Sequence, residues 1–134
     1  MKHLISLMQL GSSQLAALVR RSADFASSQG RSGKPLADRT VGIYFRRSST
    51  RTRTSFTVGA QKLGAQTVVF GPQDLQLVTG ETLEDTGRVL SGYLDALVIR
   101  TNDPQAEMEA LARQDRMAII NAMSAEEHPT QAVA

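Results

Sequence analysis

The 134-residue sequence contains no cysteine and no tryptophan. Without cysteine it can form no disulfide, no thiolate metal site and no cysteine nucleophile, and it fits a reducing compartment. Aromatic residues make up only 4% of the chain, which is few for a protein that stacks nucleic-acid bases. The apolar stretch from His3 to Leu10 is interrupted by Ser6 and Gln9, so it is too short and too polar for a signal peptide or a membrane span. We expect a cytoplasmic protein that binds neither nucleic acid nor membrane.

Charged residues are present at 21% and hydrophobic residues at 41%, which predicts one ordinary domain with a buried core. The formal net charge is only +2, but its distribution is uneven. Residues 1–62 contain eleven Lys and Arg against two Asp and Glu, whereas residues 63–134 contain four against eleven. A basic half indicates an anionic partner, or contact between the basic face of one copy and the acidic face of another. Composition does not decide between them.

The chain alternates between strand-like and helical segments. Ser12 or Ser13 is expected to cap a helix that runs to about Ser28. The run Thr40–Phe45 has the pattern of a fully buried strand, and further strands are expected at residues 66–70, 96–99 and 117–120. Helices are expected at residues 52–63 and 81–91, after an Asp103-Pro104 cap, and from Pro129 onward. This alternation predicts an α/β fold, with a parallel sheet of about four strands and helices on both faces, in three α/β/α layers.

Polar residues follow three of the expected strands. The first strand ends at Phe45 and leads into a run of Arg, Ser and Thr; the third ends at Arg100. The fourth is expected to end at Asn121, ahead of a loop that contains His128. Parallel α/β sheets bind ligands beyond the carboxyl ends of their strands. We therefore expect one site built from these segments.

The run Ser49-Thr50-Arg51-Thr52-Arg53 has the composition of a phosphate site. It lies between a strand and a helix, where free backbone N–H groups and the helix dipole favour an anion. Its hydroxyls and Arg51 add further hydrogen bonds to phosphate oxygens. Two other interpretations remain: helix-capping hydroxyls beside a solvated basic face, and a phosphorylation site for a basophilic kinase.

Arg100 follows four apolar residues, so its guanidinium must find an anion or a carbonyl or incur a large desolvation cost. A lone histidine is more often structural than functional. With Pro129 fixing the turn and Gln131 on the first helical turn, however, His128 can present an imidazole beside an amide to one ligand.

Several motifs together resemble a known family: residues 45–53 followed by Ser55-Phe56, residues 80–86, Ile99-Arg100, and His128-Pro129-Thr130-Gln131. In order and spacing they are similar to the N-terminal domain of the aspartate and ornithine carbamoyltransferases, over nearly the whole chain. The resemblance implies that Ser49, Thr50, Arg51 and Thr52 hold the phosphate of carbamoyl phosphate. It implies that Arg100, His128 and Gln131 surround the carbamoyl group, with Thr52 also reaching its carbonyl oxygen.

The implied reaction is attack by the neutral amine of an amino acid on the carbamoyl carbon, with release of phosphate. Arg100, His128 and Thr52 would be the catalytic residues, as preorganised donors to the developing oxyanion. The resemblance implies no metal and no organic cofactor, and catalysis mainly by positioning and electrostatics.

Three positions bear on the identity of the acceptor amine. Thr79 stands where aspartate enzymes have a lysine that reaches a neighbouring subunit's site, and Gln76 stands where ornithine enzymes often have a glutamine with that role. Thr130, however, is the aspartate-type residue. The resemblance therefore favours an ornithine-like acceptor, leaves aspartate open, and implies a homotrimer in the full-length protein.

Residues 1–134 correspond to the carbamoyl-phosphate-binding domain alone. We expect the family's amino-acid-binding domain to be missing and, because the sequence ends one turn into an expected helix, we expect a fragment that is inactive by itself. The alternative is a non-catalytic phosphate-binding or assembly module of the same fold. A nucleic-acid binder is the third possibility, and the scarcity of aromatic residues counts against it.

Overall fold

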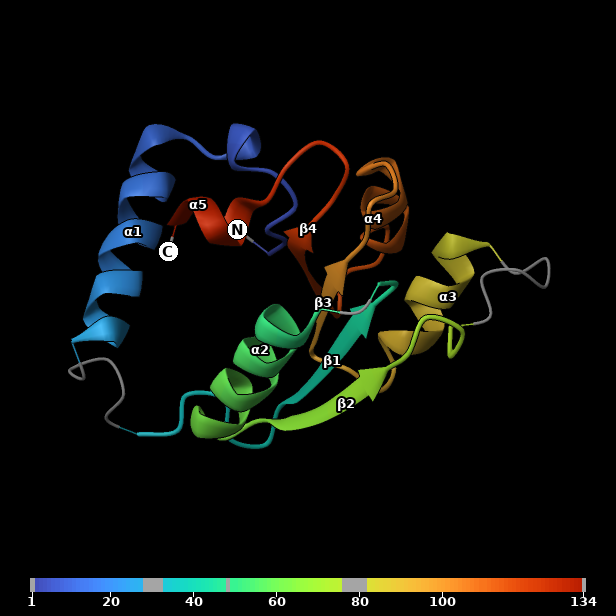
Figure 1. Ribbon diagram of the computed structural model, residues 1–134, viewed down its shortest axis with the longest axis horizontal. Coiled ribbons are helices and arrows are strands. Elements are labelled where there is room, and N and C mark those ends of the chain that lie inside the picture. The colour runs from blue at the N-terminus through green and yellow to red at the C-terminus, as the bar shows by residue number, and fades with distance from the viewer. Residues whose placement is uncertain (1, 28–32, 48, 76–81, 134) are drawn as a thin grey trace.

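The structure of the protein, a computed structural model, describes residues 2–27, 33–47, 49–75 and 82–133. Within these ranges strands and helices alternate as the sequence predicts (Figure 1). The strands are β1 (Thr40–Phe45), β2 (Gln66–Phe70), β3 (Ala96–Arg100) and β4 (Ala118–Met123). The helices are the short 3₁₀ turn η1 (Leu7–Gln9), α1 (Ser12–Ala26), α2 (Thr50–Lys62), α3 (Leu83–Leu90), α4 (Ala106–Leu111) and α5 (Pro129–Val133).

The strands form one parallel sheet in the spatial order β2-β1-β3-β4. The chain passes from β1 through α2 to β2 on one side, and then returns through α3 to place β3 on the other side of β1. The direction of strand addition therefore changes between β1 and β3. Such a switch point leaves a crevice beyond the carboxyl ends of the two strands. The predicted parallel α/β fold is confirmed, and its topology singles out one place for a ligand.

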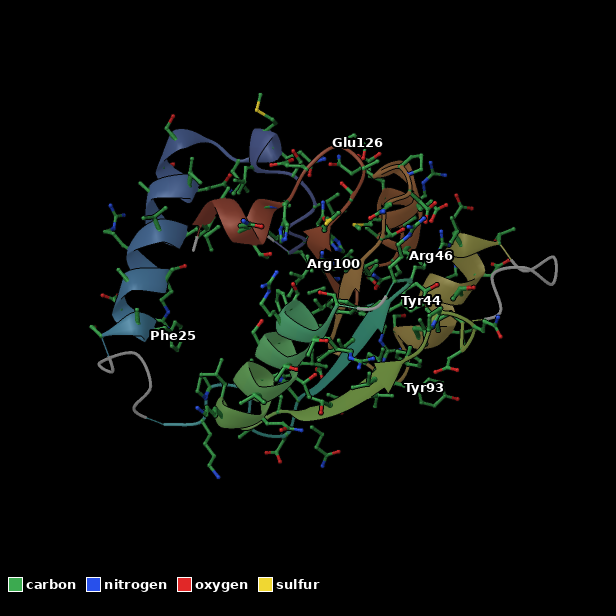
Figure 2. The ribbon with its side chains drawn as sticks, viewed as in Figure 1. Phe25, Tyr44, Arg46, Tyr93, Arg100 and Glu126 are labelled. Carbon is green, nitrogen blue, oxygen red and sulfur yellow. The ribbon has the colours of Figure 1, made fainter. Side chains whose placement is uncertain are left out.

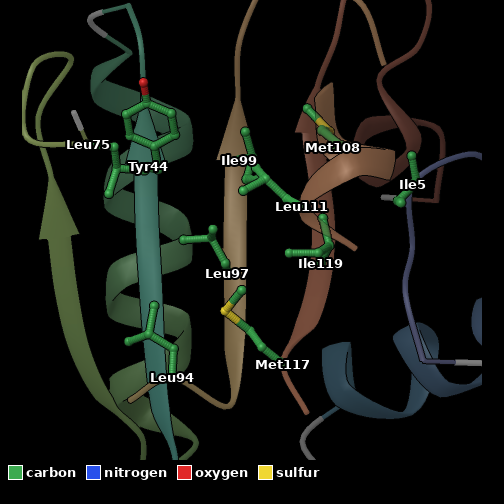
Figure 3. Packing of buried hydrophobic residues seen from close by; sticks show 10 residues of the cluster. All are labelled: Ile5, Tyr44, Leu75, Leu94, Leu97, Ile99, Met108, Leu111, Met117 and Ile119. Atoms are coloured by element: carbon green, nitrogen blue, oxygen red, sulfur yellow. The ribbon is translucent and has the colours of Figure 1, made fainter. Parts of the chain in front are cut away.

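One face of the sheet packs against α3 and α4. Figure 3 shows its buried cluster, which consists of Ile5, Tyr44, Leu75, Leu94, Leu97, Ile99, Met108, Leu111, Met117 and Ile119. α3 and α4 meet closely at Gly87, where an added Cβ would lie 2.6 Å from the Leu111 carbonyl oxygen. The contact between these helices therefore depends on the absence of a side chain at Gly87.

The opposite face packs against α2. Its buried cluster consists of Val41, Ile43, Phe45, Ala60, Ala65, Val98 and Ala122. α5 packs beside β4, and α1 lies against α5 at the rim of the molecule rather than over the sheet (Figure 1). Because helices cover both faces, the central strands are apolar along nearly their whole length. In the part of the chain that the structure describes, no helix is both long and apolar enough to cross a bilayer.

β2 is more exposed than the central strands, although its sequence is similarly apolar. Val68 and Val69 are 40% and 46% exposed. Among the described residues β2 pairs with β1 alone, so it forms an edge of the sheet. Composition identified this segment as a strand, but only the pairing shows that it is an edge strand.

The start of α1 differs from the prediction. Its N-cap is Gly11 rather than Ser12 or Ser13, which already belong to the helix. The Gln14 carboxamide oxygen accepts the Gly11 N–H at 3.1 Å, which satisfies a donor at the helix start. α2 also starts earlier than predicted, at Thr50.

The expected Asp103-Pro104 cap of α4 is wrong. α4 begins at Ala106 with Gln105 as its N-cap. The Asp103 carboxylate is engaged elsewhere, because Arg46 Nη1 donates to its Oδ2 at 2.5 Å. Asp103 therefore binds Arg46, which is distant in sequence, instead of capping the nearby helix.

β4 continues to Met123 instead of ending near Asn121. The N-terminal segment lies along its outer edge, where Leu4 is bridged to Ile120 in parallel. The Asn121 side chain, fully buried, donates to the Ile5 carbonyl at 2.8 Å. A segment more than a hundred residues away in sequence thus holds the end of β4. The loop that leads to His128 begins directly after β4.

Candidate functional site

The amino end of α2 lies directly beyond β1. Its N-cap, Ser49, has an extended backbone (φ −149°, ψ 93°), and the Ser49 carbonyl accepts the N–H of Arg53 at 3.1 Å. The N–H groups of Thr50, Arg51 and Thr52 precede this bond and have no partner within the helix. In the described part of the chain no side chain caps the helix, which counts against a purely capping role for these hydroxyls. The helix end therefore suits an anion.

Arg100 ends β3 and turns toward α2. Its Nη1 donates to Thr52 Oγ1 at 2.5 Å across a sequence separation of 48 residues. Its carbonyl accepts the Arg46 N–H at 3.1 Å, which extends the pairing of β1 with β3 past Phe45. In Figure 2 the Arg100 label lies between the ends of β3 and α2. The guanidinium of Arg100, at the end of β3, therefore lies against α2, the helix that contains most of the Ser49–Arg53 run.

His128 stands immediately before α5. The loop that precedes it is closed by a hydrogen bond from the Ser124 N–H to the Glu127 carbonyl at 2.9 Å. The Glu127 carboxylate in turn accepts the Leu7 N–H at 2.9 Å. The N-terminal segment therefore supports the loop that places His128.

These segments enclose one hollow of about 670 Å³, within the usual size of ligand pockets. Its lining residues are Arg51, Thr52, Ser55, Phe56, Arg100, Met123, His128, Thr130 and Gln131. Two guanidinium groups are among them, and within the described residues no carboxylate lines the space. The hollow is therefore suited to an anion.

The pKa of His128 lies below its ordinary value. Burial is the main cause, and the positive charge of Arg100 is the second. His128 is therefore predominantly neutral at pH 7 and has one N–H to donate. Thr130 Oγ1 lies 3.5 Å from His128 Nδ1. If the hydroxyl donates there, the ring proton is on Nε2.

Most residues predicted from the sequence meet in this hollow, and a few do not. Arg51, Thr52, Arg100, His128 and Gln131 line it together. Ser49 is the N-cap of α2 and is not among the lining residues. Thr50 is not among the lining residues of the hollow; it lines an adjoining surface depression that shares Arg51 and Ser55 with the hollow. Gln76, proposed to reach a neighbouring subunit, lies outside the described residues.

Sequence reasoning missed several lining residues. Ser55 and Phe56 lie one helical turn after Arg51 and Thr52, so their helical spacing could have indicated them. Met123 could not have been found, because β4 was expected to end before it.

A second, mostly apolar hollow lies between α2 and the sheet, and it shares Ser55 and Phe56 with the candidate site. Its floor includes Val41, Ala96, Ala118 and Ile120, from the amino-terminal halves of the strands. The ion pair between Arg39 and Asp95 stands at its rim. It offers no converging set of donors, so we do not assign the chemistry to it. Elsewhere in the described ranges no three His, Asp or Glu side chains are grouped so as to hold a metal ion.

Comparison with known domain families gives a match over residues 2–134 to the aspartate/ornithine carbamoyltransferase, carbamoyl-P binding domain. The chain belongs to this family. The family's domain therefore spans the whole sheet and all three segments of the candidate site. The resemblance inferred from the motifs is confirmed.

Individual relatives agree with this assignment. Ornithine carbamoyltransferases of Nitrosococcus oceani and Caldicellulosiruptor saccharolyticus are each 40% identical, over 98% and 100% of this chain. Among solved structures, the Pyrococcus furiosus ornithine carbamoyltransferase superposes with a TM-score of 0.89 at 35% identity, and covers 98% of this chain. The anabolic enzyme of Campylobacter jejuni gives 0.87 at 32% identity, over 99%. All of these relatives carry ornithine in their names, in agreement with the preference inferred from the sequence.

This carbamoyl-phosphate-binding domain is shorter than the proteins that it matches. The chain spans about 44% of the length of the two curated relatives. It covers 42% of the Pyrococcus furiosus chain and 43% of the Campylobacter jejuni chain.

Proposed function

We propose that this domain binds carbamoyl phosphate in the hollow beyond β1 and β3, as half of the active site of an ornithine-type carbamoyltransferase. The observation that carries the proposal is the convergence of Arg51, Arg100 and His128, which come from three separate segments, on one small space. Two cations and an imidazole N–H suit an anion that also carries a carbonyl group.

The two parts of the ligand have different partners in this proposal. The phosphate binds at the amino end of α2, to Ser49, Arg51 and Thr52 and to the free N–H groups of the first turn. Thr50 contributes through its N–H, because Thr50 is not among the residues that line the hollow. The carbamoyl group points to Arg100, His128 and Gln131, which also line the hollow.

The reaction that this arrangement supports is carbamoyl transfer to a neutral amine. The amine nitrogen forms a bond to the carbamoyl carbon, and negative charge develops on the carbonyl oxygen. Arg100, Thr52 and the neutral His128 are fixed donors for that oxygen, so they stabilise the transition state without reorganising. The carbon–oxygen bond to phosphate then breaks, phosphate keeps the electron pair, and the amine's proton passes to the departing phosphate. Arg51 and the helix end stabilise the phosphate as it leaves.

We further propose an ornithine-like acceptor, bound by the amino-acid-binding domain that the family resemblance implies. The names of the relatives support this choice over aspartate. From the same resemblance we propose a homotrimer in which Gln76 serves a neighbouring site, and from the composition we propose a cytoplasmic location. The exposed valines of the β2 edge are compatible with contact between copies.

Calorimetric titration of the chain with carbamoyl phosphate tests the proposal. We expect saturable binding that Arg51→Ala weakens roughly 10- to 100-fold, the value of a hydrogen bond to a charged group. Arg20→Ala is the matched control, because Arg20 is an exposed arginine on α1. Salt-dependent binding to duplex DNA with no carbamoyl-phosphate signal would refute the proposal.

The enzyme is distinguished from a non-catalytic module by a second assay. A protein that joins this domain to an amino-acid-binding domain should form the carbamoylated amine and phosphate in equal amounts. Carbamoyl-phosphate binding without any transfer to ornithine or to aspartate would favour the module.

A further inference from the structure

Arg46 is the first residue after β1, and it does not line the hollow. Its side chain is only 26% exposed. Nη1 lies 2.5 Å from Asp103 Oδ2 and 3.0 Å from Glu107 Oε2, and Nε donates to the Tyr44 hydroxyl at 3.1 Å. Figure 2 shows Arg46 above Tyr44 on the α4 side of the sheet. One guanidinium therefore joins β1 to the segment after β3 and to the first turn of α4.

Asp103 extends this connection to a third segment. Its N–H donates to Thr101 Oγ1 at 3.0 Å, and the Thr101 hydroxyl donates back to its carboxylate. The Asp103 carbonyl accepts the Ala125 N–H at 3.1 Å, and the Thr101 N–H donates to the Met123 carbonyl at 2.9 Å. The Thr101 hydroxyl and then Arg46 keep the pKa of Asp103 below its ordinary value, so the carboxylate stays charged. Arg46, through Asp103, thus fixes the start of the loop that leads to His128.

The backbone of Arg46 is also hydrogen-bonded to a residue of the candidate site. Its N–H donates to the Arg100 carbonyl at 3.1 Å, and it precedes the α2 N-cap, Ser49, by three residues. The residue is therefore linked to the phosphate run by sequence, to Arg100 by a backbone hydrogen bond, and to the His128 loop through Asp103.

We propose that Arg46 is a positioning residue that holds Arg100 and His128 in register with the phosphate-binding end of α2. This inference rests on the proposed function, since it concerns how carbamoyl phosphate is recognised. Arg46 does not touch the ligand. Its effect is to set the distance between the phosphate half and the carbamoyl half of the site.

The structure supplies a matched control at the opposite end of the same strands. Arg39 Nη1 lies 2.7 Å from Asp95 Oδ1, and these side chains are 61% and 38% exposed. Asp95 also accepts the Thr40 N–H at 2.8 Å. This pair joins the amino ends of β1 and β3 as the Arg46 pair joins their carboxyl ends. It resembles the Arg46 pair in chemistry, but neither Arg39 nor Asp95 lines the candidate site.

The test measures the dissociation constants of inorganic phosphate and of carbamoyl phosphate for the chain and its variants. Inorganic phosphate needs only the α2 end, whereas carbamoyl phosphate needs both halves. Arg46→Met should weaken carbamoyl-phosphate binding roughly tenfold, the scale at which losing a supporting partner disturbs binding groups. Phosphate binding should change less than about twofold, because the helix end remains. Arg46→Lys should recover part of the loss through its ion pair with Asp103.

Arg39→Met should leave both constants unchanged. Equal weakening of both ligands by Arg46→Met, no weakening of either, or the same loss in Arg39→Met would overturn the inference. If Arg46→Met does not fold, Asp103→Asn removes the carboxylate charge that Arg46 binds, with little change of shape. Asp103→Asn should then weaken carbamoyl-phosphate binding and leave phosphate binding nearly unchanged. Absence of carbamoyl-phosphate binding by the unchanged chain would overturn the proposed function itself, together with this inference. If the unchanged chain binds carbamoyl phosphate and Arg46→Met binds it equally well, only the inference about Arg46 is overturned.

Discussion

Replacement of Arg100 by methionine isolates the charge that links the two halves of the site. Methionine keeps an unbranched apolar stem but removes the guanidinium that donates to Thr52 at 2.5 Å. Because Arg100 and Thr52 are both only partly buried, Thr52 can be hydrated after the change. Removal of the charge also relieves its desolvation, so the free energy of unfolding should change by less than about 1 kcal/mol.

The effect on carbamoyl-phosphate binding should be larger. A hydrogen bond from a charged donor is worth about 1.5–3 kcal/mol, which corresponds to a dissociation constant roughly 10- to 100-fold higher. The same variant should change the titration of His128. The charge of Arg100 is the second cause of its low pKa, after burial. Arg100→Met removes only that second cause, so the pKa of His128 should rise but remain below its ordinary value.

Proton NMR titration can follow this change, because the chain has only two histidines. The pKa of His3 is lowered by burial and then by Lys2, so it serves as an internal reference that Arg100→Met should leave unmoved. The reasoning is refuted if the folded variant shows an unchanged or lower pKa at His128. It is equally refuted if carbamoyl phosphate binds the variant as tightly as the original chain.

Further predictions concern stability. Gly87→Ala should lower it by about 1–3 kcal/mol in thermal or urea unfolding, because the new Cβ meets the α4 backbone at 2.6 Å. Gly59→Ala, where the added Cβ meets open space on α2, should instead stabilise the fold by about 0.5–1 kcal/mol. Equal changes in stability for Gly87→Ala and Gly59→Ala would contradict the close contact of α3 with α4 at Gly87. Asn121→Ala should cost about 1–3 kcal/mol, because a buried carbonyl loses its donor, and an unchanged unfolding midpoint would be the contrary result. Since the folded-state pKa values of His3 and His128 are depressed, their contribution to stability is present above pH 6.5 and lost as pH falls through the folded values. Replacing both by glutamine should flatten that part of the pH profile, and an undiminished slope would argue against these shifts.

The sequence alone predicted the order of strands and helices, and it indicated the amino end of α2 as a place for an anion. The alternation of apolar runs with helical segments depends on local burial patterns, and all of the predicted strands are present. The hydroxyl and arginine run falls at a strand-to-helix junction, where unsatisfied N–H groups are a local property of the chain. Arg100 was indicated because a cation after four apolar residues requires a partner.

Several details depended on contacts between residues far apart in the chain. Asp103 was expected to cap a helix, but it binds Arg46 across 57 residues. A local capping bond and a distant ion pair compete for the same carboxylate, and the sequence does not show which partner is near. The edge position of β2 was hidden for the same reason, since its composition resembles that of a central strand.

The site as a whole was decided by the strand order. The sequence showed that a run of hydroxyls and arginines follows one strand and that a cation follows another. The strand order β2-β1-β3-β4, which the sequence does not reveal, makes β1 and β3 neighbours and places Phe45 opposite Arg100. It then places Thr52 and not the Thr50 hydroxyl against the guanidinium. Strand pairing is stabilised by the packing of both faces at once, so it is a property of the assembled core rather than of any one segment.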